Sequence, residues 1–289
     1  MLLAPPLKPL VQDQPTVAPP TYSHWPACPP PLRIPLTQLG EHPCPYLPGR
    51  EATDRAFLAD SMPPQLYHAL MDRGFRRSGN VIYQPVCRGC RACVPVRVRV
   101  ADFHPGRSHR RCIGRNADLT VIETALAADE EKFDLYCRYQ KGRHRDTSHL
   151  DWHSFVDFLY DSPVQTSEFN YRDAAGRLLA VGIVDICDQS LSSVYFFYDP
   201  AELRRGLGTY GALVEMEECR RRGIPYYYLG FWIDGCGAMA YKTSFRPCEL
   251  LGGDGVWRGV MEVVGSDPRV NDGAANADLR VTRPGDDRL

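Results

Sequence analysis

Apolar and polar residues alternate with two different periods along the chain, and the change of period predicts a mixed fold. Apolar side chains recur every three or four residues over 64–72, 128–143 and 152–160, which predicts three helices. Shorter segments rich in valine, isoleucine and aromatic residues predict strands at 81–83, 94–100, 119–123, 168–173, 178–187, 191–200 and 226–232. The order of these elements predicts an α+β or mixed α/β class, in which helices flank a sheet.

The segment from 191 to 232 predicts a strand, a glycine-rich turn, a helix and a second strand, which together form a βαβ unit. The turn, LRRGLGT, contains Gly206, Gly208 and Thr209. Backbone amides of such a turn point toward an anion at the start of the helix. These three residues are therefore candidates for holding a phosphate, although most turns of this kind only connect two elements.

The two ends of the chain lack any periodic pattern. Residues 1–31 carry ten prolines, which predicts a flexible arm over 1–40, and residues 263–289 predict a disordered tail. Between them we expect a smaller Cys/Arg-rich region at 41–125 and a larger region at 126–262. No apolar run approaches the ~18 residues of a membrane span, and the N-terminal segment does not resemble a signal peptide. Eleven cysteines without an export signal favour a cytoplasmic protein with reduced thiols.

Charge is distributed unevenly. The whole chain has a formal net charge of −1, yet residues 73–115 contain eleven arginines and a single acid, Asp102. This excess of guanidinium groups predicts a surface for a polyanion, because arginine grips phosphate oxygens with two bonds. Valine and arginine alternate over 94–100, which predicts a strand that exposes Arg97 and Arg99 beside a basic loop at 107–112. The alternative is a solvated basic face or an arginine bias of the genome, since four of the 34 basic residues are lysines.

Three cysteines, Cys87, Cys90 and Cys93, follow one another at intervals of three residues. This spacing brings sulfur atoms close to one point, as a zinc ion or an iron–sulfur cluster requires. Cys44 or Cys112 could supply the fourth ligand, and we favour Cys44 because it lies in a proline-rich turn. The alternative is a set of buried structural thiols that pack a loop.

Many short motifs of this chain resemble one known family. They are CPYLPGR, GFRRSG, CxxCxxCxPxRV, FxPxRSxRRCxxRNxDL, SSVYxFxDP, LGTY, YLGFWI and AYKxxFRP, in this order from about Pro43 to Trp257. Together they resemble the short bacterial leucyltransferases of the arginyl-tRNA–protein transferase family. The resemblance implies a fold like that of the GNAT acyltransferases. It also implies transfer of leucine from Leu-tRNA to proteins that begin with Asp or Glu, which marks them for degradation.

The chemistry of this implied reaction is aminolysis of an ester. The neutral α-amine of the acceptor must lie within about 3–3.5 Å of the donor carbonyl, and positioning alone supplies much of the rate. We expect neither a cofactor for the chemistry nor an enzyme nucleophile, because the ester is already activated. The site needs a cation for the acceptor carboxylate, donors for the oxyanion, and a group that moves a proton.

The residues predicted for these roles form three sets. The acceptor set rests on the fit of a bidentate arginine to a carboxylate, and it comprises Arg76, Arg77, Ser78 and Tyr83. The candidates for proton transfer or orientation are His144 and Tyr195. The tRNA set comprises Arg107, Arg110, Arg111 and Lys242 for phosphates, Gly206, Gly208 and Thr209 for the terminal adenosine, and Trp232 and Tyr241 for base stacking.

Other functions are compatible with the same residues. The donor could be arginyl-tRNA in the same reaction. The chain could be a coenzyme-A-dependent N-acyltransferase, although Leu203 replaces the Gln or Arg that usually precedes the turn in that fold. It could also be a Cys-cluster RNA-binding module without catalysis. We expect no membrane partner.

Overall fold

The computed structural model describes residues 21–22, 33–143 and 150–262. An eight-stranded sheet organises the fold, in the order β15-β14-β8-β13-β12-β11-β10-β9. Its strands are β8 (Val94–Arg99), β9 (Thr120–Ala125), β10 (Thr166–Arg172), β11 (Leu178–Cys187), β12 (Ser190–Tyr198), β13 (Tyr226–Trp232), β14 (Cys248–Leu251) and β15 (Trp257–Gly259). All neighbours are antiparallel except β12 and β13, which run parallel.

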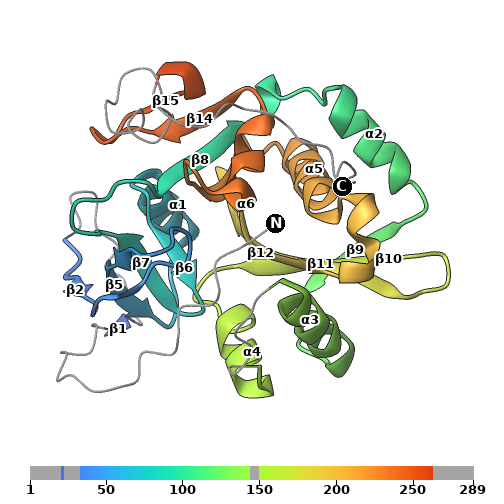
Figure 1. The fold of residues 1–289 in the computed structure, drawn as a ribbon, viewed down its shortest axis with the longest axis horizontal. Helices are drawn as coiled ribbons and strands as arrows, with labels where there is room; N and C mark the ends of the chain where they lie inside the picture. Colours follow the sequence, from blue (N-terminus) through green and yellow to red (C-terminus); the bar gives the residue numbers. More distant parts are fainter. Residues whose placement is uncertain (1–20, 23–32, 144–149, 263–289) are drawn as a thin grey trace, which may run out of the picture.

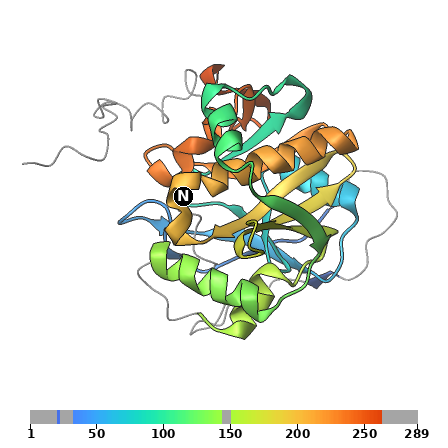
Figure 2. The ribbon, with the colours of Figure 1, turned by 90° about the vertical axis from the view of Figure 1, so that its right-hand side faces the viewer.

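Helices cover both faces of this sheet. Helix α5 (Leu207–Arg222) crosses one face, and α3 (Glu130–Arg143) and α4 (Trp152–Leu159) lie on the other (Figures 1 and 2). The predicted βαβ unit is confirmed, because α5 connects the parallel strands β12 and β13. The mixed α/β class with a helix-flanked sheet is therefore confirmed.

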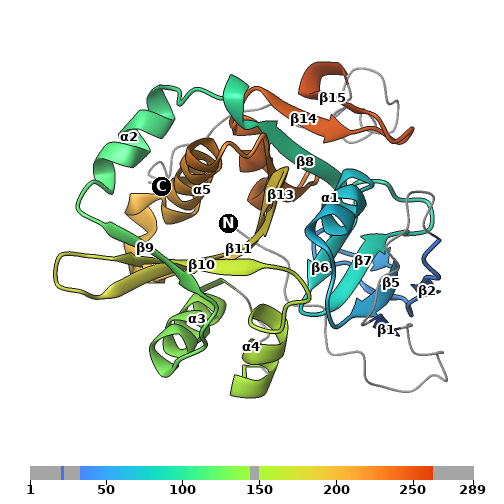
Figure 3. The same cartoon turned by 180° about the vertical axis from the view of Figure 1, so that it is seen from behind.

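Five further strands form a smaller sheet at one end of the molecule. They are β1 (Thr21–Tyr22), β2 (Thr37–Gln38), β5 (Asp54–Ala59), β6 (Arg76–Ser78) and β7 (Val81–Pro85). This sheet lies beside α1 (Pro64–Asp72), at the opposite end from α2 (Arg107–Arg115) (Figure 3). A separate hairpin joins β3 (His42–Pro43) and β4 (Glu51–Ala52), and α6 (Gly237–Ala240) follows β13.

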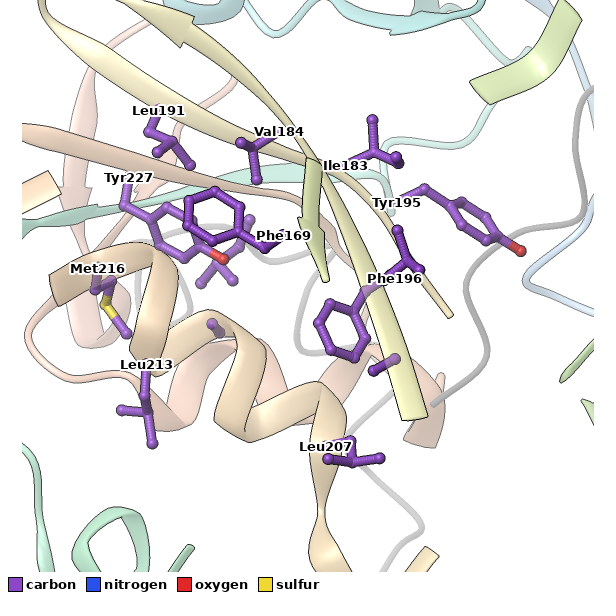
Figure 4. Packing of buried hydrophobic residues seen from close by; sticks show 14 of the residues in the cluster. Phe169, Ile183, Val184, Leu191, Tyr195, Phe196, Leu207, Leu213, Met216 and Tyr227 are labelled. Atoms are coloured by element: carbon purple, nitrogen blue, oxygen red, sulfur yellow. The ribbon is translucent and has the colours of Figure 1, made fainter. Parts of the chain in front are cut away.

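The main hydrophobic core includes side chains on both faces of the sheet, packed against α5 on one face and against α3 and α4 on the other. Successive residues of β12 point to opposite faces, so Phe196 packs toward α5 while Tyr195 points away from it (Figure 4). Gly211 of α5 has no side chain, and an added Cβ would lie 2.2 Å from the Phe196 ring. This glycine therefore lets α5 approach the sheet closely.

Two sequence predictions about organisation need correction. β1 and β2 both pair with β5, so parts of the predicted arm at 1–40 belong to the small sheet. The predicted regions 41–125 and 126–262 both contribute strands to the large sheet, β8 and β9 coming from the first. The predicted basic loop at 107–112 is helix α2. The predicted tail at 263–289 lies outside the described residues.

Candidate functional site

The parallel pair β12 and β13 separates part-way along its length. The strands pair from Ser190 to Ser192 against Tyr226 to Tyr228, and no register continues beyond that point. Both strands are irregular there, because each carries an extra residue relative to its antiparallel neighbour, Val194 in β12 and Leu229 in β13. Bulges of this kind are common next to active sites, where they redirect side chains and end pairing.

A cavity with a free volume of about 1390 Å³, including solvent at its mouth, extends from this separation to the small sheet. Residues far apart in the sequence line it. They include Cys44, Tyr46, Asp54, Arg76, Tyr83, Cys93, Ser193, Tyr195, Gly208, Glu215, Tyr227, Gly230, Phe231, Tyr241 and Lys242. The cavity therefore brings together most of the residues that the sequence motifs singled out.

Two buried cations occupy the separation between the strands. Arg76 donates from Nη2 to the carbonyl of Ser193 at 2.7 Å, and Lys242 donates from Nζ to the carbonyl of Phe231 at 2.8 Å. Both nitrogens converge beside Gly230, where an added Cβ would lie 3.4 Å from Lys242 Nζ and 3.7 Å from Arg76 Nη2. Arg76 and Lys242, which hydrogen-bond to the two separated strands, thus place their positive charges at the same point.

These cations have no counter-ion within the described part of the chain. No carboxylate there lies within 4.0 Å of Arg76 or Lys242, and Arg76 Nη1 is buried without a hydrogen-bond partner. Arg76 is 8% exposed and Lys242 is 2% exposed. Burial and then the nearby Arg76 charge lower the pKa of Lys242 to about 7. Because unpaired buried charge is costly, this arrangement fits a site that receives an anion.

The other predicted acceptor residues divide into two groups. Ser78 and Tyr83 line the cavity with Arg76, and Tyr83 pairs with Arg76 across strands β6 and β7. Arg77 also lines the cavity, but its guanidinium forms a fully buried bidentate ion pair with Asp185 of β11, with distances of 2.6 and 2.7 Å. Its guanidinium is committed to that partner, so we correct its predicted role from acceptor binding to joining the two sheets.

Glu215 of α5 lies at the inner wall of the same cavity and is fully buried. Its Oε2 accepts a hydrogen bond from the Tyr227 hydroxyl at 2.6 Å, and the nearby Ser193 side chain also favours the charged carboxylate. Its Oε1 has no hydrogen-bond partner. An added Cβ at Gly182 would lie 2.9 Å from that oxygen, so the absence of a side chain there makes room for the carboxyl group. Burial raises the pKa of Glu215 to about 7.

The two residues predicted for proton transfer differ in their placement. Tyr195 lines the cavity, and its hydroxyl accepts a hydrogen bond from the Gln140 side chain at 3.0 Å. Burial raises the pKa of Tyr195 well above its usual value, so this side chain is a hydrogen-bonding phenol at neutral pH. His144 lies outside the described residues.

Helix α2 exposes a basic face. Arg107, Arg110, Arg111 and Arg115 are exposed, and no carboxylate of the described residues lies within 4.0 Å of their guanidinium groups. Arg115 also lies beside the start of α5, where an added Cβ at Gly206 would be 3.4 Å from its Nη2. The α2 arginines and the α5 N-terminus thus form one continuous positive region.

The remaining predicted tRNA contacts have mixed outcomes. Gly208 and Tyr241 line the cavity, whereas Gly206 and Thr209 lie at the first turn of α5 outside its lining. Lys242 is buried inside the cavity and therefore cannot contact phosphates on the outer surface. Trp232 is 9% exposed and packs in the main core, so its predicted stacking on bases is wrong.

The predicted positive sheet face is wrong for Arg97, whereas Arg99 is exposed and pairs with Asp102 and Glu249. Arg97 is buried between the rings of Tyr226 and Trp257, at 4.2 and 4.3 Å, and pairs with Asp72 and Glu249. This arginine is neutralised and stacked, so it joins α1 to the large sheet instead of facing nucleic acid.

The four predicted metal ligands are free thiols that line the cavity together: Cys44, Cys87, Cys90 and Cys93. Backbone N–H groups approach two of them, Leu47 toward Cys44 and Thr53 toward Cys87, each at 3.4 Å. Burial raises the pKa of the Cys93 thiol. As positioned, no three His, Cys, Asp or Glu side chains in the described ranges could hold a metal ion. The metal site therefore stays a prediction, and no chemical step is assigned to it.

Comparison with known proteins identifies the family. Residues 42–111 match the description "Arginine-tRNA-protein transferase, N terminus", and residues 131–252 match "Arginine-tRNA-protein transferase, C terminus". The chain belongs to this family. It is accordingly an aminoacyltransferase, and the predicted resemblance is confirmed.

Individual relatives agree with this assignment. The chain is 45% identical over 222 residues to an aspartate/glutamate leucyltransferase of Parvibaculum lavamentivorans, covering 75% of this chain and 90% of that protein. It is also 45% identical over 214 residues to a protein of the same name from Pseudomonas aeruginosa strain LESB58, covering 73% and 90%.

Solved structures are more distant. One is the C-terminal domain of a putative lysylphosphatidylglycerol synthetase from Agrobacterium fabrum, with 13% identity, a TM-score of 0.41, and coverage of 69% and 68%. Another is a GCN5-related N-acetyltransferase from Kribbella flavida, with 16% identity, a TM-score of 0.31, and coverage of 60% and 56%. No helix in the described part of this transferase is long and apolar enough to cross a membrane.

Proposed function

We propose that this enzyme transfers leucine from leucyl-tRNA to the α-amino group of proteins that begin with Asp or Glu, in the cytoplasm, and thereby marks them for degradation. The names of its relatives support this proposal. The observation that carries it is the pair of buried cations, Arg76 and Lys242, that lack a counter-ion within the described residues and meet beside Gly230. A carboxylate of an N-terminal Asp or Glu supplies the charge that this point lacks.

The chemistry of the acceptor explains why two cations suit it. A carboxylate has two oxygens, and charge-assisted hydrogen bonds in a dry cavity are among the strongest that proteins form. Arg76 Nη1 is unoccupied and available for one oxygen, while Lys242 Nζ has two further protons beyond the one directed at Phe231. An N-terminal Asn or Gln would leave both charges buried and unpaired, so the cavity discriminates against these neutral analogues.

The donor end of the site lies toward α2 and α5. The exposed α2 arginines suit the phosphates of tRNA, and the first turn of α5 together with Arg115 suits the phosphate near the terminal adenosine. The cavity wall beyond the cations is apolar, with Leu229, Phe231, Ile233 and Met239. An apolar wall fits a leucyl side chain better than the charged side chain of arginine.

Catalysis then follows from positioning. The carboxylate clamp fixes the acceptor, and the tRNA-binding face fixes the ester. Holding the amine and the carbonyl in attack geometry is worth about 7–11 kcal/mol of the barrier. No step proposed for this enzyme draws on a metal or a cofactor.

The test is transfer of labelled amino acid from charged tRNA to peptides that begin with Asp, Glu, Asn or Gln. Leu-tRNA and Arg-tRNA are compared as donors. We expect transfer from Leu-tRNA to the acidic peptides. Transfer from Arg-tRNA alone would show that arginyl-tRNA, and not leucyl-tRNA, is the donor. Activity with acyl-CoA that survives RNase treatment would show that the enzyme is a coenzyme-A-dependent N-acyltransferase instead.

An arginine variant locates the acceptor site. Arg76→Ala should abolish transfer to Asp and Glu peptides and leave tRNA affinity within about twofold, because Arg76 faces the cavity and not the α2 surface. Arg73→Ala is the matched control, since Arg73 is exposed and outside the cavity lining. Equal transfer rates for Arg76→Ala and the wild type would refute the acceptor assignment.

A further inference from the structure

Glu215 is a buried carboxyl group that the positioning mechanism does not use. No cation of the described residues lies within 4.0 Å of it, and its Oε1 has no hydrogen-bond partner. Removing a carboxylate from water without a partner is costly, so a group that served only packing would be replaced at little cost by an apolar one. In this fold the position next to the carboxyl group is a glycine, Gly182, which leaves room for it.

Ser193 connects this carboxyl group to the acceptor site. Its carbonyl accepts the hydrogen bond from Arg76, and its side chain lies close enough to Glu215 to favour the charged carboxylate. Ser193 is half-buried and lines the cavity, and Glu215 is fully buried. Ser193 therefore adjoins both the carboxyl group and Arg76.

We propose that Glu215 receives the proton lost by the attacking α-amine through the Ser193 hydroxyl, and returns it to the departing ribose oxygen. This inference rests on the proposed function, because it takes the acceptor to be held at Arg76. In this relay Ser193 is the residue that touches the substrate. Glu215 accepts the proton from Ser193 and does not touch the substrate itself.

The proton balance of the step is closed. The amine nitrogen forms a bond to the ester carbonyl carbon, and one N–H proton passes to Ser193 Oγ as the Ser193 proton passes to Glu215. The carbon–oxygen bond to the ribose then breaks, and the proton returns along the same two groups to that oxygen. The products are an amide and a ribose hydroxyl, and the enzyme recovers its starting protonation state.

Lys242 of the same cavity also has a pKa of about 7, but the groups that face Glu215 stay protonated near neutral pH. They are Tyr227 on β13, Tyr171 on β10, Tyr241 beyond α6, and Cys219 on its own helix. Burial raises the pKa of each of these four above its usual value, so all four stay protonated between pH 5 and 9. The pKa of Glu215, about 7, lies inside that window.

The first experiment measures kcat at saturating acceptor peptide between pH 5.5 and 9. The wild type should show an acid limb near pH 7, below which the rate falls as the carboxylate is protonated. Glu215→Gln should lower kcat by about 10²–10⁴-fold, the range expected for loss of acid–base catalysis. It should also remove the part of the limb that belongs to the carboxylate and leave the part set by the acceptor α-amine, which must be neutral to attack. The control Glu217→Gln, two residues along α5 and exposed, should keep both rate and limb.

A second variant separates proton transfer from packing. The Tyr227 hydroxyl favours the charged form of Glu215 by donating to it, so Tyr227→Phe should move the acid limb to higher pH. A carboxyl group that only supported the fold would lower activity without moving the limb. Ser193→Ala should lower kcat about as much as Glu215→Gln does. The double variant should lose no more kcat than either single variant, because the two residues act in series.

The outcomes distinguish this inference from the proposed function. If the wild type transfers leucine to Asp and Glu peptides but Glu215→Gln retains its rate and acid limb, the relay is refuted and the function stands. The relay is likewise refuted if Tyr227→Phe leaves the limb in place. If the wild type itself transfers nothing to these peptides, the proposed function fails first. Melting temperatures of all variants, measured in parallel, show that each is folded.

Discussion

Replacing Lys242 by methionine tests the two-cation clamp most directly. Methionine keeps the length and apolar stem of lysine and removes the charge. In the wild type, Lys242 Nζ and Arg76 Nη2 meet beside Gly230, with no carboxylate of the described residues nearby. The variant leaves Arg76 alone to hold the acceptor carboxylate in a cavity that excludes water.

The size of the effect follows from this geometry. Removing one partner of a desolvated charge pair costs about 2–5 kcal/mol, and the remaining arginine should keep the loss near the lower end, about 2–3 kcal/mol. At about 1.36 kcal/mol for each factor of ten, kcat/KM for Asp and Glu peptides should fall roughly 30- to 150-fold. Peptides that begin with Asn or Gln make no ion pair, so their values should change far less and the preference for acidic peptides should collapse.

The assay compares kcat/KM for the four peptides at fixed Leu-tRNA. Lys141→Met is the matched control, because Lys141 is exposed on α3 and outside the cavity. A Lys242→Met enzyme that keeps its preference for Glu over Gln within about threefold of the wild type would refute the clamp. The pKa of Lys242, about 7, adds a pH signature. The preference should weaken as pH rises through 7 and the lysine loses its charge, whereas Lys242→Arg should keep it to pH 9.

Three further changes probe other parts of the molecule. Asp185→Asn should lower the free energy of unfolding by about 3–5 kcal/mol in urea titrations, because it leaves Arg77 buried without its partner; a loss below about 1 kcal/mol would contradict this. Changing Arg110 and Arg111 together to Gln should weaken tRNA binding and reduce the slope of log K against log salt by about 1.5, and an unchanged slope would exclude α2 as the tRNA surface. If the cysteine cluster binds metal, the purified protein should contain zinc or iron that Cys90→Ser loses; a metal-free, fully active wild type would end that prediction.

Local pattern predicted the elements and much of the cavity. The helices at 64–72 and 152–160 and the βαβ unit follow from periodicity and turns, which depend on neighbours in sequence. Arg76, Tyr83 and Lys242 were singled out by their motifs, and the fold brings them to one cavity. Nothing in the local sequence indicated that Lys242 would be buried beside Arg76 instead of facing tRNA phosphates.

Long-range pairing explains what could not be predicted. Arg77 meets Asp185 across 108 positions, and Arg97 meets Glu249 across 152. The sequence of a basic segment does not indicate acidic partners so far away along the chain. These arginines were therefore interpreted as exposed surface charges. α2 was predicted as a loop because its nine residues are mostly polar, although His109 and Cys112, three positions apart, form a buried face.

Glu215 was missed for a different reason. It lies in the sequence EMEECRRR, which resembles the solvated end of a helix. The buried positions of α5 nevertheless include Gly211, Met216 and Cys219, and Glu215 falls four residues after the first of these and four before the last. A helical projection of α5 places this acid on the apolar face, which is the signal that could have identified it.

The position of β8 has a consequence for synthesis on the ribosome. This strand belongs to the first of the two family segments, yet both of its neighbours, β13 and β14, come from the second. β8 ends at Arg99, and β13 begins only at Tyr226, so well over a hundred residues must be translated before its edges are covered. Until then, an apolar valine strand with free backbone groups is a target for chaperones and for misassembly with other nascent chains. The two segments, expressed as separate polypeptides, should regain transferase activity only when they are refolded together.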